Sequence, residues 1–370
     1  MVSDAIHPYH RGGKELRYRE LTRRLADRAE VHVYTMRWWS GPRVRTEDGV
    51  SLHAISRLLP LYANERRSVR QAIVFALSCL RLLRYSFDVL EADHIPFLQV
   101  FVLRLVATVK RKRLVVTWHE VWGRAYWREY LGAAGLVAWL IEAMAMRLPD
   151  HILAASPQTA DRLRAHLGPR HRVSVAVNGI DLAEVACAHA DPAPSDVAVV
   201  GRLVAHKRVD LLLDAIALLH AQGRPATCRV IGDGPQASAL LEQAEALGIA
   251  GAVEFRRDVT EQKDMYSLLK AARACVFPSA REGFGVAVLE ALACGVPVIT
   301  TSAPDNLARH LVARSRRGIV CDPSAPALAA AIKAVLAETG PGDGPGAAEP
   351  WLSEYTWDAL TDQVLEALRT

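Results

Sequence analysis

The sequence predicts an α/β protein with two doubly wound domains, each a parallel sheet covered by helices. The chain has 370 residues, and a single core usually stops growing well before that length. Short β-branched runs alternate with segments of helical periodicity from one end to the other, which is typical of repeated units of strand, helix and strand. A polar stretch with two prolines, residues 188–196, separates two such series.

Nine apolar runs are predicted to be strands, at residues 31–35, 87–91, 113–117, 150–154, 195–200, 227–231, 252–255, 274–277 and 297–299. Helical periodicity fills the gaps, for example between Lys207 and Gly223, where leucines recur along one face. A turn-like sequence at 178–181 places the end of the first domain nearby. We therefore expect domains over residues 1–183 and 184–350, and a closing helix over residues 351–370.

Basic residues are concentrated in the first half of the chain. Residues 1–190 hold 28 Lys and Arg against 18 Asp and Glu, and the remainder holds 17 against 22. Much of the excess adjoins apolar segments, at Arg66, Arg67, Arg70, Arg81, Arg84 and in the run 110–113. Such a segment is either an ordinary solvated helix face or a surface that meets anionic lipid or an acidic acceptor. Nucleic acid is not an expected partner, because no aromatic residues interleave with the charge.

The six cysteines lie singly, without a Cys-x-x-Cys pair, so we expect reduced thiols. No basic and apolar leader opens the sequence, and the longest apolar stretch, 131–146, is too short to span a bilayer and contains Glu142. These features favour a cytoplasmic protein, at most peripheral on the inner face of the membrane.

Residues 277–297 carry the richest pattern for chemistry, a strand, a glycine-containing turn, a helix and a second strand. Gly283 and Gly285 let backbone approach a ligand closely, and the following helix offers unpaired N–H groups that suit a phosphate. Glu290 falls in the early turns of that helix, where its carboxylate could accept hydrogen bonds from paired hydroxyls. Taken alone, two glutamates at this spacing are more often a capping acid and a solvent-facing helix residue.

The spacing of Glu282 and Glu290, with Gly-Phe-Gly between them and Gly-Val-Pro at 295–297, resembles the signature of the retaining glycosyltransferase family 4. The resemblance implies the GT-B fold, in which two Rossmann-like domains face each other across a cleft and the closing helix packs back toward the N-terminal domain. It implies the metal-independent transfer of a hexose-type sugar from a UDP- or GDP-sugar to an acceptor. A cell-envelope glycan or a lipid-linked acceptor would suit, and the main alternative is a nucleotide-sugar epimerase of the same architecture.

Other positions match the family in order along the chain. Gly201-Arg202-Leu203 and Lys207 resemble the family's phosphate-binding strand end, where the guanidinium and ammonium would neutralise a departing diphosphate. By the resemblance, Arg202, Lys207, Glu282 and His119 are the catalytic residues, with Glu282 and His119 on the transferred sugar. The resemblance assigns nucleotide-sugar binding to Gly12, Gly13, Gly283, Phe284, Gly285, Val286 and Glu290.

His119 also stands out without the resemblance. It ends a predicted strand, at the carboxyl edge where open α/β sheets bind ligands, although a lone histidine is more often structural. No Asp-x-Asp stretch offers a metal bridge to a diphosphate, so we expect no metal and no cofactor, the nucleotide sugar being a substrate. The expected partners are that donor, a glycan, lipid or small-molecule acceptor, and an anionic membrane surface.

Three departures from the family pattern limit which properties of the family can be expected of this chain. Relatives begin with a full apolar strand, whereas Met1-Val2-Ser3-Asp4 enters near its end, so we expect a shortened first strand. Arg257 stands where the family often has glycine, and the usual glycine pair is missing around residues 302–306. The base and the sugar of the donor are therefore left open.

Overall fold

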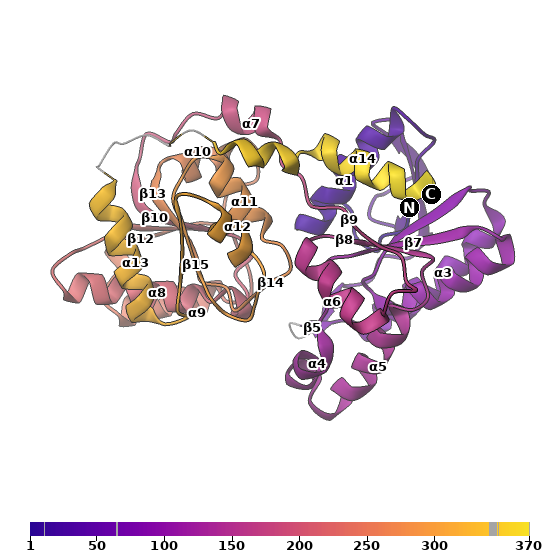
Figure 1. The fold of residues 1–370 in the computed structure, drawn as a ribbon, viewed down its shortest axis with the longest axis horizontal. Helices are drawn as coiled ribbons and strands as arrows, with labels where there is room; N and C mark the ends of the chain where they lie inside the picture. The colour runs from indigo at the N-terminus through magenta and orange to yellow at the C-terminus, as the bar shows by residue number, and fades with distance from the viewer. Residues whose placement is uncertain (11, 64–65, 340–345, 347, 370) are drawn as a thin grey trace. The chain divides into compact units, whose positions relative to one another are not determined.

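The computed structural model describes residues 1–10, 12–63, 66–339, 346 and 348–369. The chain divides into two compact units, which we describe separately (Figure 1). The first unit comprises Met1–Gly179 and Trp357–Thr370, and the second comprises Ile180–Thr356. The boundary expected at residue 183 thus lies a few residues beyond the observed one, and the last part of the expected closing segment belongs to the first unit.

The first unit is built on two groups of strands joined by the N-terminal segment. One group has the order β1 (His32–Met36), β3 (Val50–Ser56), β2 (Val44–Glu47), and the other β6 (Val89–Asp93), β7 (Arg113–Trp118), β8 (His151–Ala154), β9 (Val173–Val175). Val2 forms parallel bridges to Tyr34 of β1 and to Ala92 of β6. The short N-terminal segment therefore takes the central place in the sheet, with strands added outward on both sides.

Helices cover both faces of this sheet. On β7, Val115 belongs to one apolar core and its neighbours Leu114 and Val116 to another, and successive strand residues point to opposite faces. The first core contains α1 (Gly13–Ala26) and α14 (Trp357–Arg369). The second contains α2 (Val69–Ser78), the 3₁₀ helix η1 (Cys79–Arg84), α3 (Phe97–Lys110), α4 (Gly123–Leu131), α5 (Gly135–Ala145) and α6 (Pro157–Leu167).

The second unit has an all-parallel six-stranded sheet. Its order is β12 (Val253–Arg256), β11 (Cys228–Ile231), β10 (Ser195–Val200), β13 (Ala272–Phe277), β15 (Val298–Thr301), β17 (Gly318–Cys321). The chain moves outward from β10 in one direction and then from β13 in the other, which is the doubly wound order with its switch point between β10 and β13. The connecting helices are α8 (Val209–Ala221), α9 (Ala237–Ala246), α10 (Gln262–Lys270), α11 (Val286–Ala293), α12 (Arg309–Arg314) and α13 (Ala325–Glu338).

The nine strands predicted from the sequence are confirmed, each to within a few residues. Among those not predicted are β2, β3, β9 and β17. The β2 and β3 hairpin turns at Asp48 and Gly49, both with positive φ, 47° and 77°, which is the conformation that an Asp-Gly turn between antiparallel strands adopts. Because the residues of β2 are mostly polar and exposed, no apolar run in the sequence indicated this hairpin.

No helix in the described ranges combines the length and apolar composition needed to cross a membrane.

Leu360 tests the attachment of α14 to the first unit. Its side chain is completely buried in the core that α14 shares with α1, so Leu360→Ala should lower the free energy of unfolding by about 2–5 kcal/mol. On the same helix, Asp362→Ala removes only an exposed ion pair with Arg28 and should leave the urea unfolding midpoint almost unchanged. Equal effects of the two substitutions would contradict the observed packing.

Candidate functional site

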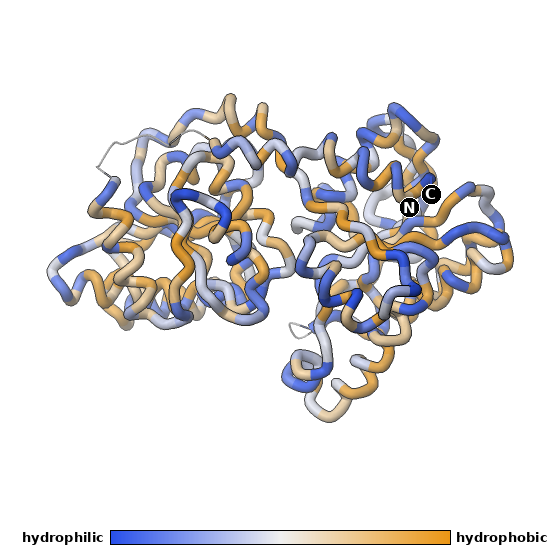
Figure 2. Tube along the Cα trace, viewed as in Figure 1, coloured by the Kyte–Doolittle hydropathy of each residue, from blue (hydrophilic) through white to orange (hydrophobic). Residues whose placement is uncertain are grey.

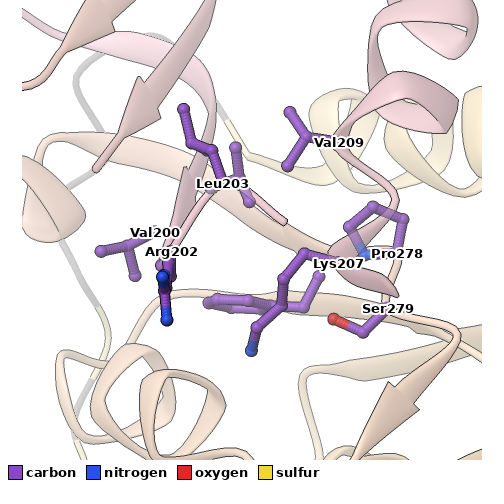
Figure 3. Close-up of a pocket in the computed structure, with 10 residues that line it drawn as sticks. Val200, Arg202, Leu203, Lys207, Val209, Pro278 and Ser279 are labelled. Carbon is purple, nitrogen blue, oxygen red and sulfur yellow. The ribbon is translucent and has the colours of Figure 1, made fainter. Parts of the chain in front are cut away.

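A pocket opens at the switch point of the second unit, at the carboxyl ends of β10 and β13 (Figure 3). It is lined by residues 199–203, Lys207, Val209 and residues 277–279. The loop after β10 is fixed by backbone contact with the loop after β11. A Cβ on Gly232, which has a φ of +131°, would lie 2.1 Å from the carbonyl oxygen of Gly201, so only glycine allows the two loops this close.

Asp233 belongs to this backbone support rather than to the pocket lining. Its carbonyl accepts a hydrogen bond from the Leu203 N–H. Its exposed carboxylate accepts hydrogen bonds from Arg257 at 2.9 Å and from the Gly234 N–H at 2.8 Å, and these lower its pKa. Arg257, the residue that departs from the family pattern, therefore holds the turn after β11.

Two basic residues and an acid meet at the pocket. Arg202 is the second residue after β10, and Lys207 ends the short 3₁₀ helix η3 (Ala205–Lys207). Figure 3 shows the nitrogen-bearing ends of both side chains pointing to the same side. Lys207 donates to Glu282, which also accepts a hydrogen bond from the Ser279 hydroxyl at 3.0 Å. Glu282 is thus held in place by partners that follow β10 and β13.

Gly285 sets the start of α11. Its φ of +90° is left-handed, and an added Cβ would lie 2.4 Å from the Cβ of Ala308, so a larger residue would be strained. Val286 is the first helical residue, and the first N–H groups of the helix have no acceptor within it. Phe284 differs from its neighbours because its ring is buried beside Tyr355, at a centroid distance of 5.9 Å. Its backbone, and that of Gly283, is the part that could serve a ligand.

Glu290 is a buried acid in the second turn of α11, only 5% exposed. Burial raises its pKa from an ordinary value near 4.5 to about 8, although hydrogen bonds from Gln262 and Tyr266 partly offset the effect. The side chain therefore carries a proton at neutral pH. These partners are an amide and a phenol hydroxyl, and a buried carboxyl with a strongly raised pKa is typical of a functional site.

In the first unit, the predicted residues Gly12 and Gly13 lie at the start of α1. Gly12 caps the helix in an extended conformation and Gly13 is its first residue, and both are exposed. The next residue, Lys14, turns inward and bridges two fully buried carboxylates, Asp4 at 3.0 Å and Asp93 at 2.8 Å. Burial alone would lower the pKa of Lys14, but the two carboxylates outweigh it and raise the pKa.

His119 lies beside Asp93 at the ends of β7 and β6. The Nε2 atom of His119 is 3.9 Å from Asp93 Oδ1, and His94 Nδ1 is 3.1 Å from the same oxygen. Burial lowers the pKa of His119 to about 3, against the opposing effect of Asp93. His119 is therefore neutral at pH 7 and can exchange hydrogen bonds with hydroxyl groups, but it is not a general acid at that pH.

Asp93, His94 and His119 also have the composition of a metal site. Within the described part of the chain, they form a group whose ligand atoms lie within 4.8 Å of one another. However, the Lys14 ammonium already compensates the charge of Asp93 and would repel a metal cation. We therefore assign no metal to this cluster, and metal independence stays a prediction.

Lys14, Asp93 and His94 were not among the functional residues predicted from the sequence. A usable signal existed, because Asp93 ends β6 and His94 follows it, just as His119 follows β7. Neighbouring parallel strands present their carboxyl ends at one edge. Lys14 carried no comparable signal, since its inward direction depends on Asp4 and Asp93 being buried together.

Two family models match consecutive parts of the chain. Residues 11–184 match the model described as Glycosyltransferase Family 4, and residues 189–342 match the model described as Glycosyl transferases group 1. The chain therefore belongs to the glycosyltransferases that these two models describe. The family match favours a transferase over the epimerase that the sequence had left as an alternative.

Two curated relatives show the extent of the sequence similarity. The glycogen synthase of Mycobacterium tuberculosis is 30% identical over 222 residues, which cover 59% of this chain and 51% of that protein. The D-inositol 3-phosphate glycosyltransferase of Rhodococcus jostii is 30% identical over 239 residues, which cover 60% of this chain and 52% of that protein. The chain thus spans about half the length of the curated relatives it matches.

Solved structures match this glycosyltransferase along its whole length. Sucrose-phosphate synthase from Thermosynechococcus elongatus aligns with a TM-score of 0.82 at 19% identity, covering 100% of this chain and 97% of that one. Anabaena HepE in complex with UDP-glucose aligns with a TM-score of 0.75 at 20% identity, covering 100% and 98%. At such identities the likeness shows the fold, and it confirms the GT-B prediction.

The raised pKa of Glu290 predicts a pH-dependent stability. The folded state holds this proton more tightly than the unfolded state does, so the contribution to stability is complete below about pH 4.5 and is lost as the pH rises through about 8. The stability of the wild type relative to Glu290→Gln should therefore fall between about pH 4.5 and pH 8, by at most about 1.4 kcal/mol per pH unit.

Urea unfolding of both proteins across that range measures the effect. Glu242→Gln, at an exposed position of α9, is the control and should keep a constant difference from the wild type. A constant difference for Glu290→Gln as well would show that Glu290 is ionised at neutral pH.

Proposed function

We propose that this glycosyltransferase moves a hexose-type sugar from a UDP- or GDP-sugar to an acceptor hydroxyl, with retention of anomeric configuration and without a metal ion. One observation carries the proposal. The switch-point pocket of the second unit is lined by two cationic side chains, Arg202 and Lys207. The segment after its residues 277–279 leads into α11, which carries the buried carboxyl of Glu290. Cations and free N–H groups suit a diphosphate, and a carboxyl suits paired ribose hydroxyls.

The diphosphate would be held by Lys207, Arg202 and the first N–H groups of α11. Lys207 is already oriented by Glu282, so little reorganisation is needed when negative charge develops on the leaving group. Glu282 would then share its oxygens between Lys207 and hydroxyls of the transferred sugar. Glu290 would meet the ribose and release its proton on doing so.

Retention can be achieved without a protein nucleophile. The acceptor oxygen attacks the anomeric carbon from the side that the leaving group departs, the bond from that carbon to the diphosphate oxygen breaks, and the acceptor proton passes to that same oxygen. The protein then contributes by positioning the substrates and stabilising charge. In the first unit, we assign neutral His119 to a hydrogen bond with a sugar hydroxyl, and the N–H groups of Gly12 and Gly13 to the donor phosphate.

The names of relatives support a nucleotide-sugar donor but not one base. HepE is described in complex with UDP-glucose, whereas a Mycobacterium tuberculosis relative, 31% identical over 145 residues, is described as a GDP-mannose-dependent mannosyltransferase. Both bases therefore enter the test.

Calorimetric titration with UDP and GDP, with EDTA present, tests the donor site. One of the two should bind, and Lys207→Ala should weaken that binding roughly 10- to 150-fold, because a hydrogen bond to a charged group contributes about 1.5–3 kcal/mol. Affinity for the corresponding nucleoside, which lacks the diphosphate, should not change. Lys263→Ala, at an exposed position of α10, serves as the control. No binding of either nucleotide, or equal effects of the two substitutions, would refute the assignment.

Substitution of His119 tests the role proposed for the first unit. His119→Ala should lower kcat by roughly 5- to 150-fold through the loss of one hydrogen bond, about 1–3 kcal/mol, while nucleotide affinity stays the same. His119→Asn, which keeps a donor and an acceptor, should recover part of the rate. Because the pKa of His119 is lowered to about 3, its side chain is already neutral at pH 5. The pH profile of kcat should therefore show no ionisation of this residue between about pH 5 and pH 8. An ionisation that disappears in His119→Ala would contradict the proposed role.

A further inference from the structure

Exposed apolar side chains gather on one group of helices in the first unit. Of the seventeen large apolar residues that are exposed among the described residues, eleven lie on α2, η1, α3 and α5. These eleven, which we call the apolar face, are Val69, Ile73, Leu77, Leu80, Leu83, Leu105, Val109, Leu136, Val137, Leu140 and Met144.

The spacing of these residues makes stripes rather than scattered positions. On α2 they recur at 69, 73 and 77, and on α5 at 136, 140 and 144, which is the interval that keeps side chains on one side of a helix. The opposite sides of the same helices are also apolar and lie in the core, for example Phe75 and Leu103. A helix that is apolar on both sides is usually covered on both sides.

The helices that carry the apolar face are neighbours. Helix α3 packs against β6 and β7 beneath it and against α2, η1 and α5 beside it. Side chains that point away from the core on these helices therefore open to one common surface of the first unit. Figure 2 shows α5 mostly in orange, the hydrophobic end of the scale, at the position that Figure 1 labels.

The charges among these apolar residues are almost all positive. The four helices contain five basic residues, Arg70, Arg81, Arg84, Arg104 and Lys110. Their single acid, Glu142, is fully buried and accepts hydrogen bonds from Trp127 Nε1 at 2.7 Å and the Trp122 N–H at 2.8 Å. Two carboxylates near the edge, Asp88 and Asp150, each pair with a basic residue, Lys112 and Arg104.

An aromatic residue completes the pattern. Trp139 on α5 is half-buried, and the Arg124 guanidinium lies 5.7 Å from the centre of its ring. A tryptophan beside a guanidinium, among exposed aliphatic side chains, is typical of segments that sit at the level of lipid headgroups.

We propose that the apolar face docks on the surface of an anionic lipid bilayer. The aliphatic side chains enter the boundary between headgroups and acyl chains, and the basic residues meet the lipid phosphates. Charge decides between this partner and a second copy of the chain. Two copies would bring like charges together without an exposed acid on these four helices to compensate them, whereas an anionic bilayer supplies the opposite charge over the whole surface.

Sedimentation with vesicles tests the proposal. The wild type should sediment with phosphatidylcholine vesicles that contain phosphatidylglycerol, bind pure phosphatidylcholine much more weakly, and dissociate as salt is added. The double variant Leu77→Glu/Leu140→Glu should bind these vesicles at least about tenfold more weakly than the wild type. The matched control, Leu241→Glu/Leu247→Glu, changes two exposed leucines of the second unit and should bind like the wild type.

A charge variant separates the lipid contact from a folding defect. Arg70→Glu/Arg84→Glu leaves the aliphatic residues in place and should also lose binding, with an unchanged thermal unfolding midpoint. The proposal is overturned if the wild type does not bind anionic vesicles at low salt, if it binds neutral and anionic vesicles equally, or if the control variant loses as much binding as the others. Self-association that Leu77→Glu/Leu140→Glu abolishes, without vesicle binding, would assign the apolar face to a second copy instead.

Discussion

The direction of the parallel strands is the constraint on which both candidate sites depend. Parallel strands all end at the same edge of a sheet, so the loops that follow them converge there, most closely where the winding reverses. In the second unit this brings Gly201 and Arg202 after β10 beside Pro278 and Ser279 after β13. In the first unit it brings Asp4, after the central Val2 segment, beside Asp93 at the end of β6.

The carboxyl edges of the two sheets differ in how their buried acids are stabilised. In the first unit, Lys14 pairs with the buried carboxylates of Asp4 and Asp93, and burial keeps His119 neutral beside this ion pair. In the second unit, the buried carboxyl of Glu290 is hydrogen-bonded to the neutral side chains of Gln262 and Tyr266, and it keeps its proton. A buried charge is costly unless it is paired, and a group without a pair neutralises itself. The first arrangement fixes geometry, whereas the second leaves a group that can respond to a polar ligand.

The sequence predicted the parts of this fold that depend on local patterns. Apolar runs located the central strands, and the spacing from Glu282 to Glu290 located the start of α11. It could not show that the Phe284 ring packs against Tyr355 or that Lys14 turns inward. Nor could it show that residue 232 must be glycine because the Gly201 carbonyl lies against it. Each of these depends on contacts between segments far apart in sequence. The basic residues near the apolar helices were visible in the sequence, but only the structure shows that Glu142 is buried and leaves their charge uncompensated.

Hydrogen exchange of the backbone amides, with and without the nucleoside diphosphate that binds, tests the central claim most directly. If the ligand occupies the carboxyl edge of the second sheet, protection should appear in residues 201–208 and 279–290. The loops at the opposite edge, residues 222–227 and 294–297, should exchange at unchanged rates. Protection at residues 222–227 and 294–297, with none at 201–208, would place the ligand at the amino edge and contradict the account.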